Sequence, residues 1–269
     1  MESELEEIEF LALSANRVDV LRLLAERAHT RNELASETGA SQATLGRILG
    51  DFQERSWIRR TGSEYSATAT GTLVASGFTE LQEIIGTERR LRDVVDYLPA
   101  DAMAFDLKRL ADATITTPSQ TRPNAPLSRL LGLLEDATDV QTLSHAFNEQ
   151  TITVVQERTT TGAQTFNGVF SRRAIEALAA DPELRGRLET LLETDAASIR
   201  VQDGDVPLAV MLLDDVVYLL LRDDDGVLRA SIDTDDETVR AWAQTTIDDY
   251  WADATPLSLE DDAFCDRDR

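Results

Sequence analysis

Lysine is almost missing from this 269-residue sequence: Lys108 is the only one among 26 basic residues. Cysteine is equally scarce, and a single thiol, Cys265, can close no internal disulfide and makes a poor metal site. No run approaches the roughly 20 consecutive apolar residues of a membrane-spanning helix. The N-terminus, MESELEEIEF, is acidic, whereas a secretory signal starts basic and then turns apolar. These absences predict a cytoplasmic protein that does not span a membrane.

Histidine is also rare, since only His29 and His145 occur. The sequence has no glycine-rich phosphate loop, no nucleophile elbow and no cluster with metal-ligand spacing. The acidic turns at 203–205 and 223–226 lack the 12-residue spacing and closing Glu of an EF-hand loop, so we expect solvated turns. We therefore predict no catalytic residues, no metal and no cofactor. An enzyme with an N-terminal interaction module is the least favoured class of protein.

Acidic residues, in contrast, are abundant: 50 Asp and Glu give a formal net charge of -24. Acid enrichment with arginine in place of lysine resembles the proteomes of salt-accumulating archaea, because dense carboxylates keep a surface hydrated and self-repelling. We interpret the charge mainly as halophilic adaptation, and a specific cationic partner is the alternative. The acidity is uneven, with 24 acidic and 8 basic residues in 181–269 but 7 acidic and 8 basic residues in 14–70.

The segment that escapes the acidity follows the order of a small helical domain with a hairpin. Apolar spacing predicts two helices before Ala28. Thr30 and Glu33 form a capping-box pattern for a third helix, which Gly39 ends. Ser41 caps a fourth helix, which extends to about Arg55. Its apolar stripe consists of Leu45, Ile48, Leu49 and Phe52. A strand, a turn and a second strand follow, and they predict a wing.

The exposed N-terminal half of the fourth helix is small, polar and basic, which suits the major groove of DNA. Small residues permit close approach, glutamine can make two hydrogen bonds to adenine, and arginine can meet guanine or phosphate. The paired arginines of the wing could reach the adjacent minor groove or backbone. The predicted DNA contacts are Thr30, Arg31, Ser41, Gln42, Ala43, Thr44, Gly46, Arg47, Arg59 and Arg60.

A family pattern runs through this segment. It consists of Glu33-Leu34-Ala35, Gly39, Ser41, Thr44-Leu45, Arg47, Leu49, Phe52, Trp57-Ile58 and Tyr65-Ser66-Ala67-Thr68-Ala69-Thr70-Gly71. The pattern resembles the winged helix-turn-helix domain of archaeal transcriptional regulators and covers about the first 75 residues. The resemblance implies that residues 1–70 bind double-stranded DNA. Winged helices can also bind proteins, so an interaction adaptor without DNA contact is the alternative.

Apolar spacing continues beyond the wing, from Thr70 to about Leu98, and predicts a long helix. We expect residues 71–100 to connect the domains and to pair with their copy in a homodimer, which would read two half-sites. Packing within one chain is the alternative. Residues 101–135 are expected to form a linker and short helices, since three of the seven prolines lie in 116–126.

Strand and helix patterns alternate in residues 136–256, in the order β-α-β-α-α-β-β-β-β-α. This order predicts an α/β sensor domain with a mixed sheet, and an acidic tail follows over 257–269. A second family pattern consists of residues 203–210, residues 214–221, Asp225-Gly226 and Ala241-Trp242-Ala243. It resembles the effector domain of archaeal methanogenesis-type regulators, which has been compared with the phospholipase-D-like sensor domain of TrmB-type regulators. The resemblance implies sensing of a small-molecule or protein effector.

The enzymes of that sensor fold need a histidine and a lysine in each of two sites, which two histidines and one lysine cannot supply. The candidate effector contacts are polar residues at strand ends, where α/β folds place ligands. They are Ser144, His145, Asn148, Ser171 and Arg172, and Arg172 would meet an anion. The sequence thus predicts a dimeric transcriptional regulator of mixed α+β and α/β class. It would combine a winged helix, a long connecting helix and a C-terminal sensor domain.

Overall fold

The computed structural model describes residues 3–260 and separates the chain into two compact units, one up to Gly86 and one from Thr87 onward. Cys265 and most of the predicted acidic tail lie outside the described residues. No helix of the described part is both long and apolar enough to pass through a membrane.

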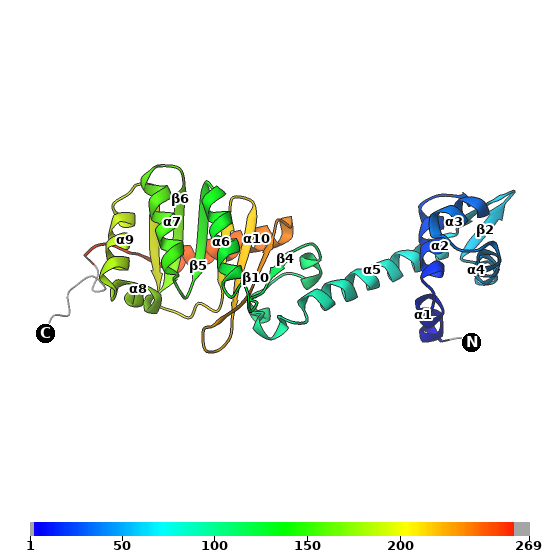
Figure 1. Ribbon diagram of the computed structural model, residues 1–269, viewed down its shortest axis with the longest axis horizontal. Coiled ribbons are helices and arrows are strands. Elements are labelled where there is room, and N and C mark those ends of the chain that lie inside the picture. The colour runs from blue at the N-terminus through cyan, green and yellow to red at the C-terminus, as the bar shows by residue number, and fades with distance from the viewer. Residues whose placement is uncertain (1–2, 261–269) are drawn as a thin grey trace. The chain divides into compact units, whose positions relative to one another are not determined.

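The first unit is a winged helix (Figure 1). Its elements are α1 (Glu4–Ala12), α2 (Ala15–Glu26), β1 (His29–Thr30), α3 (Arg31–Thr38), α4 (Gln42–Glu54), β2 (Ile58–Thr61), β3 (Glu64–Ala67) and most of α5 (Ala69–Leu91). The three strands form an antiparallel sheet in the order β1-β3-β2. One apolar core holds the helices to this sheet, and Leu34, Leu45 and Phe52 are fully buried in it.

Local capping explains where α3 and α4 begin and end. The hydroxyl of Thr30 accepts a hydrogen bond from the backbone N–H of Glu33, whose carboxylate accepts one in return from the backbone N–H of Thr30. Gly39 ends α3 with a φ of 69°, a left-handed conformation that glycine adopts readily. Ser41 then caps α4. Gly39 and Ser41 therefore set where α3 ends and where α4 begins.

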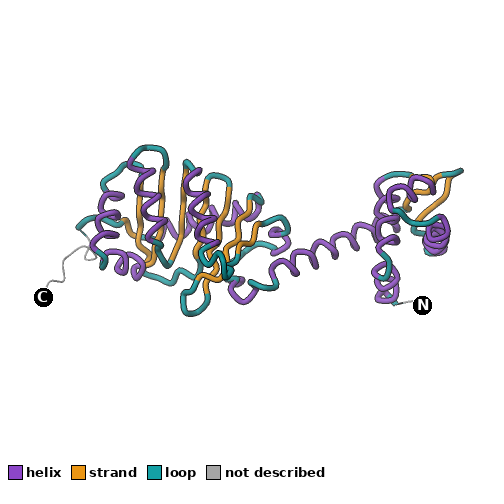
Figure 2. The backbone as a smooth tube through the Cα atoms, in the orientation of Figure 1, coloured by secondary structure: helices purple, strands orange, loops and turns teal. Residues whose placement is uncertain are grey.

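The second unit is built on one eight-stranded mixed sheet (Figure 2). It opens with three 3-10 turns, Val95–Tyr97, Ala100–Ala102 and Leu107–Leu110. Its further elements are β4 (Thr114–Thr116), α6 (Ala125–Asp136), β5 (Asp139–Ser144), α7 (Glu149–Thr160), β6 (Thr165–Ser171), α8 (Arg172–Ala179), α9 (Pro182–Leu192), β7 (Ala197–Gln202), β8 (Ala209–Leu213), β9 (Val216–Arg222), β10 (Leu228–Thr234), α10 (Glu237–Asp253) and β11 (Thr255–Pro256). The predicted order of strands and helices is confirmed from β5 to α10.

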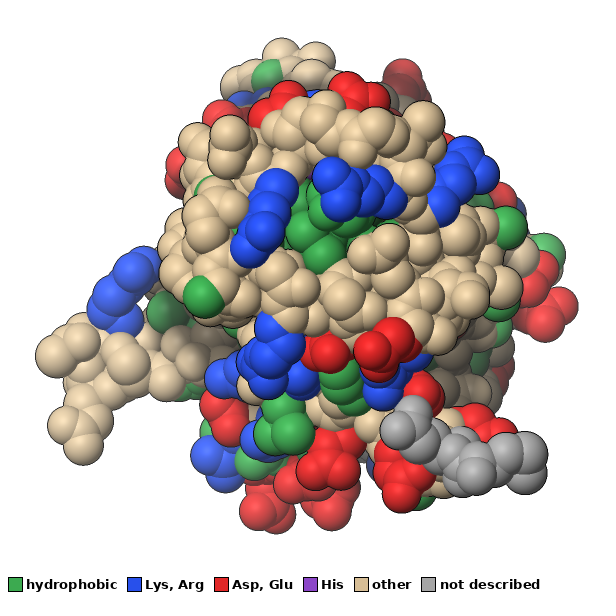
Figure 3. Space-filling view, turned by 90° about the vertical axis from the view of Figure 1, so that its right-hand side faces the viewer, with side chains coloured by type: hydrophobic (Ala, Val, Ile, Leu, Met, Phe, Trp, Pro, Cys, Tyr) green, Lys and Arg blue, Asp and Glu red, His purple; other side chains and the backbone are tan. Residues whose placement is uncertain are grey.

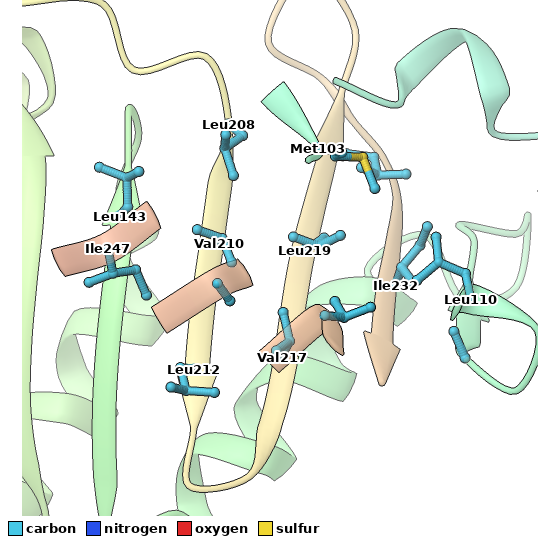
Figure 4. Packing of buried hydrophobic residues seen from close by; sticks show 14 of the residues in the cluster. Met103, Leu110, Leu143, Leu208, Val210, Leu212, Val217, Leu219, Ile232 and Ile247 are labelled. Carbon is cyan, nitrogen blue, oxygen red and sulfur yellow. The ribbon is translucent and has the colours of Figure 1, made fainter. Parts of the chain in front are cut away.

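The strand order in the sheet is β11-β7-β6-β5-β8-β9-β10-β4. Strands β5, β6 and β7 are parallel, and the other neighbouring pairs are antiparallel. Alternate residues of each strand face opposite sides, and each side is covered by helices. Helices α6 to α9 pack on one side, while α10 packs on the other, where Val210, Leu219 and Ile247 meet (Figure 4). The predicted fold class, with a mixed sheet in the second half, is confirmed.

Two segments differ from the sequence-based expectation. Helix α5 ends at Leu91 rather than near Leu98, because Leu91 and Val94 turn into the core of the second unit. The guanidinium of Arg90 stabilises this turn by donating hydrogen bonds to the carbonyl oxygens of Ala111 and Ala113. The segment expected as a linker, 101–135, contributes edge strand β4 and helix α6 to the second unit.

Candidate nucleic-acid interface

Helix α4 presents one buried and one exposed face, as its apolar stripe predicts. Leu45, Ile48, Leu49 and Phe52 are buried in the core of the first unit. The opposite face exposes Gln42, Ala43, Gly46 and Arg47. The hydroxyl of Ser41 accepts from the backbone N–H of Thr44 at 3.1 Å, so Ser41 and Thr44 stabilise the first turn. The N-terminal half of α4 is thus a fixed, exposed surface of short polar side chains with one arginine.

Arg31 lies across the first turns of α4. Its guanidinium donates a hydrogen bond to the carbonyl oxygen of Gln42, and a Cβ at position 46 would lie 2.7 Å from its Nη2. Gly46 therefore leaves room for the guanidinium of Arg31. The amide of Gln42 donates to the side chain of Asn32 at 3.3 Å. The start of α3 and the start of α4 consequently form one continuous polar surface.

The wing consists of β2, β3 and a tight turn in which Gly62 has a φ of 65°. Its two arginines point to opposite faces of the hairpin, because successive residues of a strand alternate. Arg60 pairs with Tyr65, lies 5.5 Å from that ring and donates from Nε to the carbonyl oxygen of Gly62 at 2.9 Å. Arg59 lies opposite Ser66 and is exposed. The two guanidinium groups therefore lie on different faces of the wing.

Ion pairing divides the eight arginines of residues 14–70 into two groups. Four have carboxylate partners: Arg17 with Asp51 at 3.7 Å, Arg22 with Glu26 at 3.0 Å, Arg27 with Glu37 at 3.1 Å and Arg55 with Glu7 at 2.8 Å. Among the described residues, the four without a carboxylate partner are Arg31, Arg47, Arg59 and Arg60. These are the four arginines among the predicted DNA contacts. Figure 3 faces this unit and shows basic side chains around a largely uncharged area, with acidic side chains below.

Thr30 has a structural role in this surface. Its hydroxyl both accepts from the backbone N–H of Glu33 and donates to the carboxylate of Glu33 at 2.8 Å. These hydrogen bonds from the backbone and the hydroxyl of Thr30 lower the pKa of Glu33. Glu33 therefore remains an anion at neutral pH close to the predicted DNA contacts.

Sequence reasoning missed two residues beside this surface. Asn32 contacts Gln42 only because α3 and α4 cross at the turn, and no local pattern predicts that contact. Arg17 is half-buried, stacks on the Phe10 ring at 3.9 Å and donates to the carbonyl oxygen of Phe10 at 2.7 Å. Burial, and then the charge of Arg47, lowers the pKa of Arg17. Arg17 thus places a second positive charge near Arg47.

The second unit contains a cavity of about 340 Å³ between α7 and the sheet. Of the five predicted effector contacts, Ser144 and Asn148 lie in its wall. Ser171 caps α8 and donates to the carbonyl oxygen of His145 at 3.4 Å. Arg172 forms an exposed ion pair with Asp203 and is not among the residues that line the cavity. The structure thus brings together only part of the predicted set.

Two further residues of this region were not predicted, Arg222 and Thr151. Arg222 ends the antiparallel strand β9, and Thr151 lies inside the first turn of α7 rather than at a strand end. His145 is close to Arg222, and burial followed by the positive charge of Arg222 lowers the pKa of His145. His145 is therefore neutral near pH 7 and adds no charge to the cavity region.

Comparisons with known proteins agree with this architecture. Residues 5–90 match the family model of the HVO_A0261 N-terminal domain, and residues 123–253 match that of the middle domain of the methanogenesis regulatory protein FilR1. No curated protein matches the chain.

Solved structures that resemble the chain are distant. TrmBL2, an archaeal chromatin protein described as showing a novel mode of DNA binding, is 14% identical, with a TM-score of 0.40 over 95% of this chain and all of that chain. Nuc, a phospholipase D family member from Salmonella typhimurium, is 9% identical, with a TM-score of 0.43 over 54% of this chain and 98% of that chain. ZitR of Lactococcus lactis is 24% identical, with a TM-score of 0.26 over 29% of this chain and 59% of that chain.

The two domain models match separate parts of the chain, each covering most of one compact unit. One of them is named for a regulatory protein, and neither is named for an enzyme. The chain therefore resembles the HVO_A0261 N-terminal domain over residues 5–90 and the FilR1 middle domain over residues 123–253, in agreement with the resemblance to archaeal regulators seen in its sequence.

Proposed function

We propose that this protein is a cytoplasmic transcriptional regulator that binds specific sites in double-stranded DNA through α4 and the wing. The observation that carries the proposal is the pairing of arginines in the first unit. Within the described residues, Arg31 at the start of α3, Arg47 of α4 and the two wing arginines have no carboxylate partner, while the other four arginines of 14–70 are paired. Unpaired guanidinium groups around a helix that fits the major groove are the chemistry that meets phosphates and guanine.

The high salt implied by the composition makes site-specific contacts more important. Release of counterions from DNA contributes little affinity when the salt concentration is high. A single arginine on the exposed face of α4, with glutamine and small residues beside it, gives base contacts and close fit a larger share of the binding free energy. The acidic surface elsewhere would repel DNA and limit binding to this surface.

The proposed regulator is a homodimer. Large apolar side chains are exposed on α1 and α5 of the first unit, where soluble monomers rarely leave such a surface open. They are Leu5, Ile8, Leu81, Ile84 and Ile85. An apolar groove between these helices, lined by Leu11, Val74 and Phe78, continues the surface. A second copy that covers it would pair two α4 helices for two half-sites, as winged helix dimers require.

The second unit is proposed to sense an effector. Its cavity is the concave, mostly apolar space that small ligands occupy in proteins. Regulation requires the effector to bind two arrangements of the dimer with different affinity, because only that difference shifts their populations. An activator and a repressor are equally compatible with this scheme.

The proposal is tested by selecting bound fragments from the organism's own sheared DNA with purified protein at high salt, followed by sequencing. We expect a shared motif with wild-type protein, and its loss with Arg47→Gln and Arg59→Gln. Arg22→Gln removes the same charge from a paired, exposed arginine and is the matched control. Fragments without a motif, or equal recovery by all variants, would contradict direct reading by this surface and favour an adaptor that binds another protein.

A further inference from the structure

The cavity of the second unit lies under α7, on the side of the sheet covered by α6 to α9. Most of its wall is apolar, and the residues that give it this character include Leu127, Leu130, Phe147, Ile152, Phe170 and Met211. Phe147 and Phe170 stack at 3.9 Å and form a flat aromatic boundary. The volume of about 340 Å³ exceeds that of a few water molecules and accommodates a small organic molecule.

One cationic side chain lines this apolar space. Arg222 is half-buried at the end of β9, and its Nη1 donates to the carbonyl oxygen of Gly226 at 2.8 Å. Its Nε is buried without a hydrogen-bond acceptor, and no carboxylate within residues 3–260 pairs with it. Burial lowers its pKa, although a guanidinium stays charged at neutral pH. A half-buried cation without an anion is costly unless something else supplies one.

Several other arginines of the second unit have carboxylate partners. Arg129 pairs with Asp233 at 2.7 Å, and Arg229 pairs with Asp223 at 2.6 Å. Acidic residues outnumber basic ones threefold in 181–269, so a carboxylate partner for Arg222 would be easy to provide. Its absence leaves one positive charge facing an apolar cavity within an otherwise acidic unit.

A second unsatisfied group lies in the same wall. The hydroxyl of Thr151 is buried without a partner, one turn into α7. Asn148 caps that helix by accepting from the backbone N–H groups of Gln150 and Thr151. The cavity thus offers a guanidinium and an unpartnered hydroxyl beside the side chains of Asn124, Thr142, Ser144 and Asn148, and the N-terminal end of α7 adds partial positive charge. One cationic side chain does not suit a polyphosphate, which needs several positive charges.

We propose that the cavity binds a small amphipathic carboxylate, whose anionic group pairs with Arg222 and whose hydrocarbon body fills the apolar space. This inference specifies the ligand class for the sensing role proposed above. Only its consequence for regulation rests on that proposed role. Binding itself depends on the cavity and on Arg222 alone. The charge on Arg222 selects the carboxylate over its neutral and cationic analogues, and the cavity wall selects the hydrocarbon chain.

Calorimetric titration of the full chain with octanoate, octanamide and octylamine tests the proposal. We expect octanoate to bind and the other two to bind at least about 10-fold more weakly. Arg222→Gln should weaken octanoate about 10- to 100-fold, as loss of a charged hydrogen bond does. Arg240→Gln, which removes an arginine paired with Asp215 outside the cavity, should leave octanoate binding unchanged. Leu127→Trp, which fills the cavity, should abolish binding.

The outcomes separate this inference from the proposed DNA function. Failure of octanoate to bind, equal binding of octanamide, or full affinity in Arg222→Gln would overturn the carboxylate site. Thermal unfolding of each variant shows whether the second unit still folds. If Arg222→Gln fails to fold, Leu127→Trp provides an independent test of the site. If octanoate binds as expected but the affinity of the protein for selected DNA does not change, the carboxylate site is supported and its regulatory role is refuted. Absence of DNA binding would refute the proposed function and leave the titration result intact.

Discussion

The guanidinium of Arg31 occupies the space beside Gly46, so that a methyl group at position 46 would lie 2.7 Å from its Nη2. Gly46→Ala should therefore displace Arg31 from the carbonyl oxygen of Gln42 and move a positive charge on the predicted DNA surface. The substitution should also stabilise helix α4 itself by up to about 1 kcal/mol, because alanine is a better helix former than glycine.

We expect Gly46→Ala to weaken binding to a selected DNA site roughly 10-fold while thermal stability stays equal or rises. Gly50→Ala is the matched control, since a methyl group there meets no atom within 4 Å. Unchanged DNA affinity in Gly46→Ala would show that the position of Arg31 does not matter for binding.

Gly71 is required where α5 leaves the wing. A Cβ at this position would lie 1.9 Å from the carbonyl oxygen of Trp57, a backbone atom that cannot move away easily. Gly71→Ala should destabilise the first unit by at least about 1–3 kcal/mol. Hydrogen exchange of the α4 amides measures this loss. Gly77→Ala, on the same helix in open space, should stabilise it by about 0.5–1 kcal/mol, and equal exchange in the two variants would contradict the predicted clash.

The apolar face of α5 tests the predicted dimer. Leu81 and Ile85 are one turn apart and are 41% and 49% exposed. Leu81→Glu and Ile85→Glu should each raise the dissociation constant of the dimer at least about 10-fold, because a carboxylate would have to be buried. Sedimentation velocity over a range of concentrations measures the change, and Gln82→Glu adds the same charge beside the stripe. A wild-type chain that sediments as a monomer at all concentrations would exclude this interface.

Asp214 should make stability depend on acid pH. Burial favours its neutral form, but hydrogen bonds from Asp139 and Thr138 to its carboxylate prevail and lower the pKa of Asp214. Because the pKa is lower in the folded state, the stabilisation is complete above the ordinary carboxyl pKa of about 4 and is lost as pH falls through the folded value.

Replacing this side chain separates hydrogen bonding from backbone strain. Asp214→Gly removes the hydrogen bonds but accommodates the φ of 50°, whereas Asp214→Ala removes them and keeps the strain. Both should lower the free energy of unfolding at pH 7, by about 1–2 kcal/mol for glycine and more for alanine. Urea titrations at pH 7 and pH 3 measure both effects. A difference from wild type that does not shrink at pH 3 would contradict the role of the carboxylate.

Local patterns were sufficient to predict most of the first unit and the order of the sheet elements. The capping residues Thr30 and Ser41 and the glycine at 39 are read directly from the sequence, and they place α3 and α4. Alternating apolar residues likewise predict the strands from β5 to β10, because each strand buries at least one face.

Contacts between elements could not be predicted in the same way. The end of α5 at Leu91 depends on a core that lies in the other half of the sequence. The cavity is assembled from α6, α7 and several strands, so the sequence did not predict that Arg222 lines it. Arg172, at a more typical strand end, was predicted to line it but pairs with Asp203 instead. Arg59 and Arg60 are adjacent in sequence but lie on opposite faces, which a reading of them as one basic pair does not capture.

Occupancy of the tagged protein across its own genome, measured in cells at their native salt, tests DNA recognition by α4 and the wing most directly. Wild type, Arg47→Gln, the double variant Arg59→Gln/Arg60→Gln and the paired-arginine control Arg22→Gln would be compared at equal abundance. We predict sharp peaks over a shared motif for wild type and Arg22→Gln, and their loss in the other two. Peaks that persist in Arg47→Gln and in the wing variant would contradict this interface, since the protein would then reach DNA through another surface or another protein.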